Sequence, residues 1–319
     1  MVSKAIVTDH TFPSLELQRD IFRSSDFELR EAEPACRTEA DLIDRCKDTS
    51  VLLVQWAPVT RKVLEALPKV KCVVRYGVGV DNIDLIAAKS LGVTVANVPD
   101  YCVEEVSNHA LAMMCSLCRR IPQDHNQILS GGWGVGPFRP IPAFSELIVG
   151  LVGFGAIARR VAEKAKVFGY QIIAFDPYVS HSVFIELEVE RVDQMTLLNR
   201  SDVISLHCPL LPKTKHLINH QTIQLMKSGT ILINTARGAL VREPDLIAAL
   251  TSSKIGGAGL DVFEVEPLPA DSALRSLPNV LLTSHAASVS EMAVQSLQVK
   301  AATTACEFLK GNRPVRAIV

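Results

Sequence analysis

The chain has 319 residues, of which 48% are hydrophobic and 21% are charged, and its formal net charge is -1. These values are typical of a globular protein, and the length favours two domains over one. The near-neutral charge argues against a nucleic-acid partner or an anionic membrane surface. The longest apolar stretch, 147–158, is too short to span a bilayer, and the N-terminus lacks a signal-peptide pattern, so we expect a cytoplasmic protein.

Short β-branched runs alternate with helical patterns through the first third of the chain. Apolar runs without polar alternation are typical of buried parallel strands. We expect strands at 5–9, 50–56, 72–77 and 93–98. The helical patterns between them lie at 38–48, 60–68 and 82–92. This alternation predicts a doubly wound α/β sheet.

A longer helical pattern covers residues 102–121 and contains Cys115 and Cys118, which are spaced like a metal or redox pair. No Gly or Pro knuckle and no second pair of ligands accompany them. We therefore interpret both cysteines as packing residues of a buried helix and expect no metal site. The next segment, 131–144, is crowded with Gly, Pro and aromatic residues, and we predict a loop that acts as a lid.

The alternation then resumes and continues to the end of the chain. The expected strands lie at 147–153, 171–177, 202–208, 230–236, 257–263 and 280–285, and the expected helices at 157–169 and 290–311. Two doubly wound parallel-sheet α/β domains in series are the simplest account. The pattern alone does not say on which domain the last helix packs.

A glycine-rich turn follows the strand at 147–153 and opens a helix. It reads Gly153-x-Gly155-x-x-Ala158, and the next strand ends on Asp176, 21 residues after Gly155. Gly153 permits the tight turn, Gly155 lets the backbone approach a pyrophosphate, and the helix N-terminus attracts the phosphates. The acidic residue stands where it can bind an adenosine ribose. Because Asp176 would repel a 2′-phosphate, we predict NAD(H) rather than NADP(H).

Ionisable side chains follow several of the predicted strands. They are His207, Arg237, Asp261 and His285, with Glu266 in the loop after Asp261. Ligands of doubly wound sheets bind beyond the carboxyl ends of the strands. Hydride transfer needs a proton-transfer partner, for which a histidine beside a carboxylate is suited, and an arginine can clamp a substrate carboxylate. The spacing leaves His207 and His285 as equal candidates.

Together these stretches resemble the D-isomer-specific 2-hydroxyacid dehydrogenase family over nearly the whole chain. The phrases VPDYCVEE and SHAASVSE lean toward the branch of the C-terminal-binding proteins and their bacterial relatives. The motifs that carry the resemblance are VVRYGVGVDNIDL, ANVPDYCVEEVSNHALAMM, GLVGFGAIARRVA, LINTARGALVREPDLIAAL, GGAGLDVFEVEP and NVLLTSHAA.

The resemblance implies that a Rossmann dinucleotide-binding domain, 102–288, is inserted into a flavodoxin-like substrate-binding domain. The latter would consist of 1–101 and 289–319, so the last helix would return to the first domain. The resemblance also implies that the catalytic residues are Arg237, Glu266 and His285.

The resemblance further implies the binding residues. The substrate carboxylate would contact Arg237 and the backbone of Gly77, Val78 and Gly79. The implied NAD(H) contacts are Gly153, Phe154, Gly155, Ala156, Ile157, Asp176, Pro177, His207, Cys208, Pro209, Thr214, Thr235, Ala236, Asp261, His285 and Ala287.

The implied activity is NAD-dependent interconversion of a 2-oxo acid and a D-2-hydroxy acid. The alternative is an NADH-sensing, corepressor-like binding protein with little turnover. The resemblance also implies a homodimer formed through the dinucleotide domain. The helix at 102–121, with Met113, Met114 and Leu117, is either that interface or a helix that packs on its own sheet.

Overall fold

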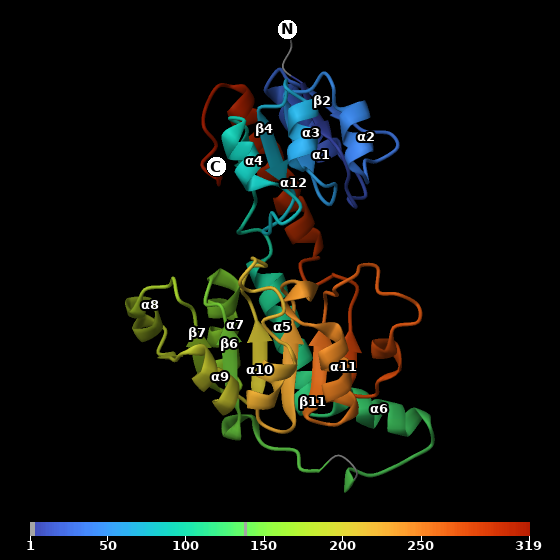
Figure 1. The fold of residues 1–319 in the computed structure, drawn as a ribbon, viewed down its shortest axis with the longest axis vertical. Coiled ribbons are helices and arrows are strands. Elements are labelled where there is room, and N and C mark those ends of the chain that lie inside the picture. Colours follow the sequence, from blue (N-terminus) through green and yellow to red (C-terminus); the bar gives the residue numbers. More distant parts are fainter. Residues whose placement is uncertain (1–3, 137–138) are drawn as a thin grey trace. The chain divides into compact units, whose positions relative to one another are not determined.

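The computed structural model describes residues 4–136 and 139–319. The chain divides into two compact units, one formed by Met1–Cys102 with Val289–Val319 and the other by Val103–Ser288. Each unit contains one parallel β-sheet covered by helices (Figure 1). The predicted fold class, two doubly wound parallel-sheet α/β domains, is confirmed.

The sheet of the first unit has five strands in the flavodoxin-like order β2-β1-β3-β4-β5. Its strands are β1 (Lys4–Val7), β2 (Glu28–Glu31), β3 (Val51–Val54), β4 (Cys72–Arg75) and β5 (Thr94–Ala96). The central strands β3 and β4 are buried along their whole length, as expected for strands covered on both faces. The edge strand β2 is polar and was not predicted.

Helices cover both faces of this sheet. They are α1 (Glu16–Ser24), α2 (Glu39–Arg45), α3 (Arg61–Ala66), α4 (Leu85–Ser90) and α12 (Glu291–Leu309). Phe22 of α1 packs in one core cluster with Leu297 and Ala301 of α12. Helices α2, α3 and α4 contribute Leu42, Val63 and Ala87 to the other cluster. The last helix of the chain is therefore part of the first unit.

The sheet of the second unit has seven strands in the order β12-β11-β10-β9-β6-β7-β8. They are β6 (Ile148–Val152), β7 (Gln171–Phe175), β8 (Glu190–Arg191), β9 (Val203–Leu206), β10 (Thr230–Asn234), β11 (Ile255–Leu260) and β12 (Val280–Leu282). The chain runs outward from β6 through β7 to β8, and then crosses back to β9 on the other side of β6. This reversal is the Rossmann switch point, beside which such sheets bind ligands.

Helices on opposite faces of this sheet contribute to two core clusters (Figure 1). Helices α5 (Val103–Cys118), α7 (Ala156–Val167) and α8 (His181–Glu186) contribute to one, and α9 (Gln194–Arg200), α10 (His220–Leu225) and α11 (Glu243–Thr251) to the other. Helix α6 (Ile121–Leu129) has no buried residue. Short 3₁₀ turns occupy Phe144–Glu146, Gly238–Leu240 and Ala273–Ser276.

Helix α5 decides one alternative that the sequence leaves open. Met113, Met114 and Leu117 are 0–2% exposed and pack in the core of their own unit. Gly259 of β11 permits this approach, because a Cβ there would lie 3.0 Å from the Cβ of Met113. Of the two alternatives, the structure therefore supports packing on its own sheet for these residues. Cys118 belongs to the same buried cluster, which agrees with a packing role.

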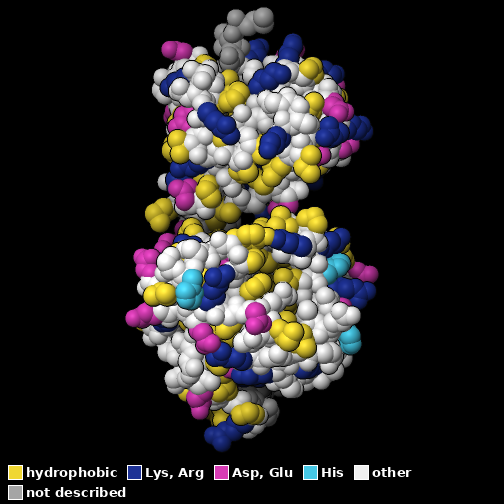
Figure 2. All heavy atoms as spheres, turned by 60° about the vertical axis from the view of Figure 1, so that its left-hand side comes forward, with side chains coloured by type: hydrophobic (Ala, Val, Ile, Leu, Met, Phe, Trp, Pro, Cys, Tyr) yellow, Lys and Arg dark blue, Asp and Glu magenta, His cyan; other side chains and the backbone are white. Residues whose placement is uncertain are grey.

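The surface carries charges of both signs. On the face that Figure 2 shows, Lys and Arg side chains are interspersed with Asp and Glu, as the net charge of -1 suggests. Within the part of the chain that the structure describes, no helix is long and apolar enough to cross a membrane. The same residues contain no group of three or more His, Cys, Asp or Glu side chains that could hold a metal ion.

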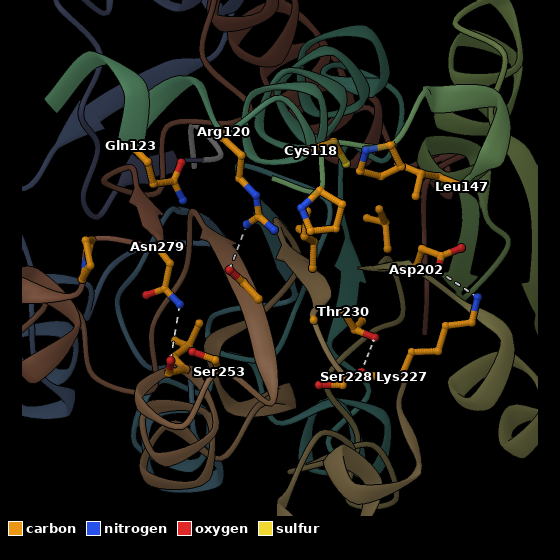
Figure 3. A pocket seen from close by; sticks show the side chains of 18 of the residues that line it. Cys118, Arg120, Gln123, Leu147, Asp202, Lys227, Ser228, Thr230, Ser253 and Asn279 are labelled. Atoms are coloured by element: carbon orange, nitrogen blue, oxygen red, sulfur yellow. Dashed lines mark hydrogen bonds and ion pairs between the residues drawn. The ribbon is translucent and has the colours of Figure 1, made fainter. Parts of the chain in front are cut away.

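The segment predicted as a lid lies at the opposite edge of its sheet. Arg139, Pro140 and Pro142 line a cavity of about 840 Å³ together with Val203 and Thr230, at the amino ends of β9 and β10 (Figure 3). The predicted site residues follow the carboxyl ends of the strands. The segment is a loop, as predicted, but its described residues 139–142 lie away from the strand ends that carry the predicted site, which does not support a role as its lid. Residues 137 and 138 of the segment lie outside the described residues.

Candidate active site

The turn after β6 lies at the switch point of the sheet. Gly153 has φ +89°, and a Cβ on it would lie 2.8 Å from the backbone nitrogen of Cys208. Gly155 caps α7 without a side-chain hydrogen bond, and no heavy atom lies within 4 Å of its Cβ position. Helix α7 has 12 residues, and its first turn begins at Ala156 and Ile157. An anion at this end can bind the N–H groups of that turn and is attracted by the positive end of the helix dipole.

Asp176 is fixed beside this turn by backbone donors. Its Oδ2 accepts the N–H of Phe154 at 2.8 Å, and its Oδ1 accepts the N–H groups of Tyr178 at 2.8 Å and Val179 at 3.2 Å. These bonds orient the carboxylate where β7 ends and the chain continues into Pro177. The acid and the glycine turn are thus brought together, as the sequence predicts for a ribose-binding residue.

Phe154 differs from the other residues of the turn. Its ring is fully buried and stacks on Phe184 with 4.6 Å between the ring centroids. Its N–H bonds Asp176, and its carbonyl accepts the Nε of Arg159 at 2.9 Å. Its backbone N–H and carbonyl are therefore already hydrogen-bonded within the turn. A cofactor contact by Phe154 stays a prediction.

The segments that follow β9 and β10 contain further polar side chains, Thr214 and Thr235. The Oγ1 of Thr235 is buried and has no hydrogen-bond partner among the described residues. Thr214, by contrast, accepts the N–H of Leu211 and donates to the carbonyl of Pro209, both at 2.7 Å. A buried hydroxyl without a partner is uncommon in folded proteins and marks a position where a ligand group fits. The open helix end, the oriented acid and this hydroxyl together fit a dinucleotide.

A histidine–carboxylate pair lies at the carboxyl ends of β11 and β12. The Nδ1 of His285 lies 2.7 Å from the Oε2 of Glu266, whose Oε1 accepts the N–H of Phe263 at 3.0 Å. His285 has φ +55°, a left-handed conformation that costs energy for a residue other than glycine. Its N–H donates to the carbonyl of Asp261 at 2.8 Å, which stabilises this geometry.

The electrostatics keep Glu266 ionised. Burial alone would raise the pKa of its carboxyl. The hydrogen bond with His285, the N–H of Phe263 and the positive charges of His285 and Arg237 together outweigh burial and lower the pKa. Glu266 therefore presents a negative charge to the imidazole of His285 near neutral pH. A carboxylate in this position fixes the tautomer and the orientation of the ring.

The other histidine candidate is in a different state. Burial lowers the pKa of His207 to about 4, and its Nε2 lies 2.9 Å from the hydroxyl of Ser205. A neutral imidazole cannot donate a proton as an imidazolium near neutral pH. Of the two histidines that the spacing leaves equal, only His285 has a carboxylate partner.

Comparisons with known proteins agree with this geometry. Residues 111–287 match the profile of the "D-isomer specific 2-hydroxyacid dehydrogenase, NAD binding domain". The chain is 37% identical over 278 residues to a glyoxylate reductase of Korarchaeum cryptofilum, which covers 86% of this chain and 83% of that protein. The chain belongs to the D-isomer specific 2-hydroxyacid dehydrogenase family. The second unit contains the NAD-binding domain of this family, so the chain is an NAD-dependent dehydrogenase.

Other relatives differ in length and name. A D-3-phosphoglycerate dehydrogenase of Methanocaldococcus jannaschii is 40% identical over 277 residues, which are 86% of this chain and 52% of that protein. This chain thus spans about half of that relative. A crystal structure of D-lactate dehydrogenase from Aquifex aeolicus, complexed with NAD and lactic acid, has a TM-score of 0.85 and 27% identity. It covers 97% of this chain and 96% of its own. The predicted branch of the family stays a prediction.

One network of this dehydrogenase was missed by sequence reasoning. The Oδ1 of Asp261 accepts the hydroxyl of Thr283 at 2.6 Å and the N–H of Ala286 at 2.8 Å, and its Oδ2 accepts the N–H of Ala287 at 3.0 Å. His109 of α5 lies 2.9 Å from the Thr283 hydroxyl. Asp261 therefore holds the turn that carries His285. No local pattern marks His109, because its partners are far away in the chain.

The first unit contains the predicted carboxylate-binding segment. Gly77 has φ +145°, and its carbonyl accepts the N–H of Val98, while the carbonyl of Val78 accepts the side-chain amide of Asn97 at 2.6 Å. A Cβ on Gly77 would lie 1.3 Å from Nη1 of Arg75, a buried residue that sequence reasoning also missed. The roles of Gly77, Val78 and Gly79 stay predictions.

Proposed function

We propose that this dehydrogenase interconverts a 2-oxo acid and the corresponding D-2-hydroxy acid. The observation that carries the proposal is the 2.7 Å bond between His285 and Glu266, beside the charge of Arg237, at one edge of an NAD-binding sheet. A proton donor, a carboxylate that sustains it and a guanidinium are the groups that reduction of a carbonyl in an anionic substrate requires.

Each residue has a distinct part in the reduction. NADH, when bound, supplies a hydride to C2 of the 2-oxo acid. His285 donates a proton to the carbonyl oxygen as the negative charge develops there, and in the reverse direction its neutral ring accepts the hydroxyl proton. Glu266 accepts the hydrogen bond at Nδ1, which leaves Nε2 to exchange the proton with substrate.

Arg237 is proposed as the substrate anchor. It directly follows the turn after β10, its Nη1 donates to its neighbour's carbonyl at 2.7 Å, and it is half-buried. A guanidinium can bind a carboxylate through two parallel hydrogen bonds and so fixes the plane of the acid. The same charge would stabilise the alkoxide that forms at C2.

The names of the relatives suggest the substrate class. Similar proteins are named glyoxylate reductase, hydroxypyruvate reductase and glycerate dehydrogenase, and these match 80–87% of their own length. We propose that this chain likewise acts on a short 2-oxo acid of two to four carbons, such as glyoxylate or hydroxypyruvate.

The test is NADH absorbance with purified protein and a panel of glyoxylate, pyruvate, hydroxypyruvate, 2-oxoglutarate and longer 2-oxo acids. Turnover with a short acid that is lost in both H285A and R237A supports the proposal. Tight NADH binding without turnover on any acid contradicts it, and would favour the NADH-sensing alternative. NADPH is run in parallel to test the predicted cofactor preference.

We further propose that the protein is a homodimer, with α6 and the segment after it at the interface. Ile121 and Leu129 of α6 and the nearby Trp133 are 55%, 72% and 90% exposed. Apolar side chains gathered on one segment commonly mark a protein interface. Light scattering should give twice the chain mass, and the variant L129D/W133D should be a monomer. A monomeric wild type would contradict this. The cytoplasmic location stays a prediction.

A further inference from the structure

A second histidine–carboxylate pair lies two residues from Glu266. The Nε2 of His216 lies 2.6 Å from the Oε1 of Glu264, and the two side chains are 33% and 24% exposed. Neither residue belongs to the predicted catalytic or binding set. The pair therefore requires a separate explanation.

Glu264 also forms two hydrogen bonds with Glu243. Its Oε2 accepts the N–H of Glu243 at 2.8 Å, and its own N–H donates to the Oε1 of Glu243 at 2.5 Å. This reciprocal pair joins the loop after β11 to the first residue of α11. Because Glu264 accepts both His216 and the Glu243 N–H, its carboxylate is fully oriented within the loop.

His216 is also bound through its backbone. Its N–H donates to the carbonyl of Ala239 at 2.8 Å, and Ile218, two residues further along the chain, forms a parallel bridge with Val241. The segment 239–241 begins two residues after Arg237. The backbone of His216 thus contacts the segment that follows Arg237. Its ring contacts the loop that contains Glu266.

Gly238 brings these two segments into direct contact. A Cβ on Gly238 would lie 1.9 Å from both the carbonyl carbon and the oxygen of Phe263, and 2.5 Å from the nitrogen of Glu264. The N–H of Phe263 in turn donates to Glu266. Phe263 therefore packs against Gly238 through its carbonyl group and bonds Glu266 through its N–H.

We propose that His216, Glu264 and Glu243 are positioning residues, which fix Glu266 relative to His285 and Arg237 without touching substrate. This inference rests on the proposed function. Loss of the His216 side chain removes its hydrogen bond to Glu264, so the loop becomes more mobile. The carboxylate of Glu266 is then less often within hydrogen-bonding distance of Nδ1 of His285. A misplacement of about 1 Å at a reacting group costs up to roughly 100-fold in rate.

The experiment compares H216A with H216Q, in which an amide N–H can replace the imidazole donor to Glu264. The exposed His181 provides the matched control H181A. Turnover and the KM for NADH are measured with the best 2-oxo acid. The double variant H216A/E266Q is measured beside E266Q. Hydrogen exchange of the peptide 261–268 reports the loop directly and requires no turnover.

We expect H216A to lose about 10- to 100-fold in kcat with the KM for NADH within threefold of wild type. We expect H216Q to recover most of the loss. In the E266Q background H216A should cost less than threefold, because His216 acts through Glu266. The peptide 261–268 should exchange faster in H216A than in H181A.

Three results would overturn the inference. They are unchanged exchange in H216A, an undiminished cost of H216A in the E266Q background, and a loss of kcat that H216Q does not recover. A wild-type protein without turnover on any 2-oxo acid would instead refute the proposed function, and the exchange measurement would still decide whether His216 holds the loop.

Discussion

His285 and Glu266 lie 2.7 Å apart, although one follows β12 and the other lies in the loop after β11. Their contact depends on a left-handed backbone at His285, which Asp261 supports through backbone and side-chain bonds. The pair is therefore a property of two loops held by buried polar groups. Strain of this kind, about 1–3 kcal/mol, persists only where the surrounding structure supports it.

The two glycines of the phosphate turn should respond differently to alanine. In G153A the Cβ would clash with the backbone of Cys208 at a positive φ, so we expect a loss of about 1–3 kcal/mol of unfolding free energy together with NADH affinity. In G155A, where φ is -74°, the stability loss should be smaller, at most about 1 kcal/mol for a poorer N-cap residue, while NADH affinity falls at least about tenfold because the methyl group blocks the pyrophosphate.

Urea unfolding and NADH fluorescence titration measure both quantities. G155A serves as the folded control for G153A. Equal stability losses in the two variants, or unaltered NADH binding in G155A, would contradict the proposed position of the pyrophosphate.

Asp176 should set the choice of cofactor. D176S removes the carboxylate that would repel a 2′-phosphate, and Arg191 donates to the carbonyl of residue 176 at 3.3 Å, so a guanidinium lies nearby. We expect the ratio of kcat/KM for NADPH over NADH to rise by about tenfold or more. E186S removes one charge from the exposed part of α8 and is the matched control. An unaltered ratio in D176S would show that the ribose lies elsewhere.

Arg237 should be needed for catalysis and only partly replaceable. We expect R237A to lose about 3–4 kcal/mol of transition-state stabilisation, by comparison with the loss of one preorganised donor, which is roughly 10²–10³-fold in kcat/KM. R237K keeps the positive charge but cannot form the bidentate hydrogen bonds to a carboxylate, so it should retain intermediate activity. Activity of R237A within tenfold of wild type would rule out the anchor role.

Glu266 should contribute to stability in a defined pH range. Its pKa is lowered in the folded protein, so its carboxylate binds fewer protons there than in the unfolded chain. The stabilisation is therefore fully present above the ordinary carboxyl pKa of 4.5, and is lost as the pH falls through the lower folded value. Urea unfolding from pH 7 to pH 3 should show a larger acid loss in wild type than in E266Q. Parallel curves would contradict this.

Much of the fold could be predicted because buried parallel strands have a strong apolar pattern. The sequence ELRE of β2 was missed because an edge strand has no need to be apolar on both faces. The pattern of α5 predicts one buried face but does not say whether that face packs on its own sheet or on a partner, so both alternatives stayed open for Met113 and Met114. A Gly- and Pro-rich segment predicts a loop without predicting at which edge of the sheet it lies.

The candidate site residues could be predicted where they directly follow a strand, because they then lie at the carboxyl edge of the sheet. Asp176 and Arg237 follow strands and lie at the expected edge. His216, Glu264 and His109 were missed because their partners come from remote loops and helices, and spacing carries no information about such contacts. Similarly, spacing could not separate His207 from His285, which burial and a carboxylate partner distinguish in the structure.

The most direct test is the pH dependence of kcat/KM for 2-oxo acid reduction in wild type and E266Q. If His285 donates the proton with Glu266 sustaining its charge, the wild-type rate should fall as the pH rises and the ring loses its proton. In E266Q the rate should be at least about tenfold lower at each pH, because no carboxylate then orients the ring and stabilises the charge that it exchanges with substrate. Identical profiles at comparable rates would contradict the assignment of this pair as the acid–base centre.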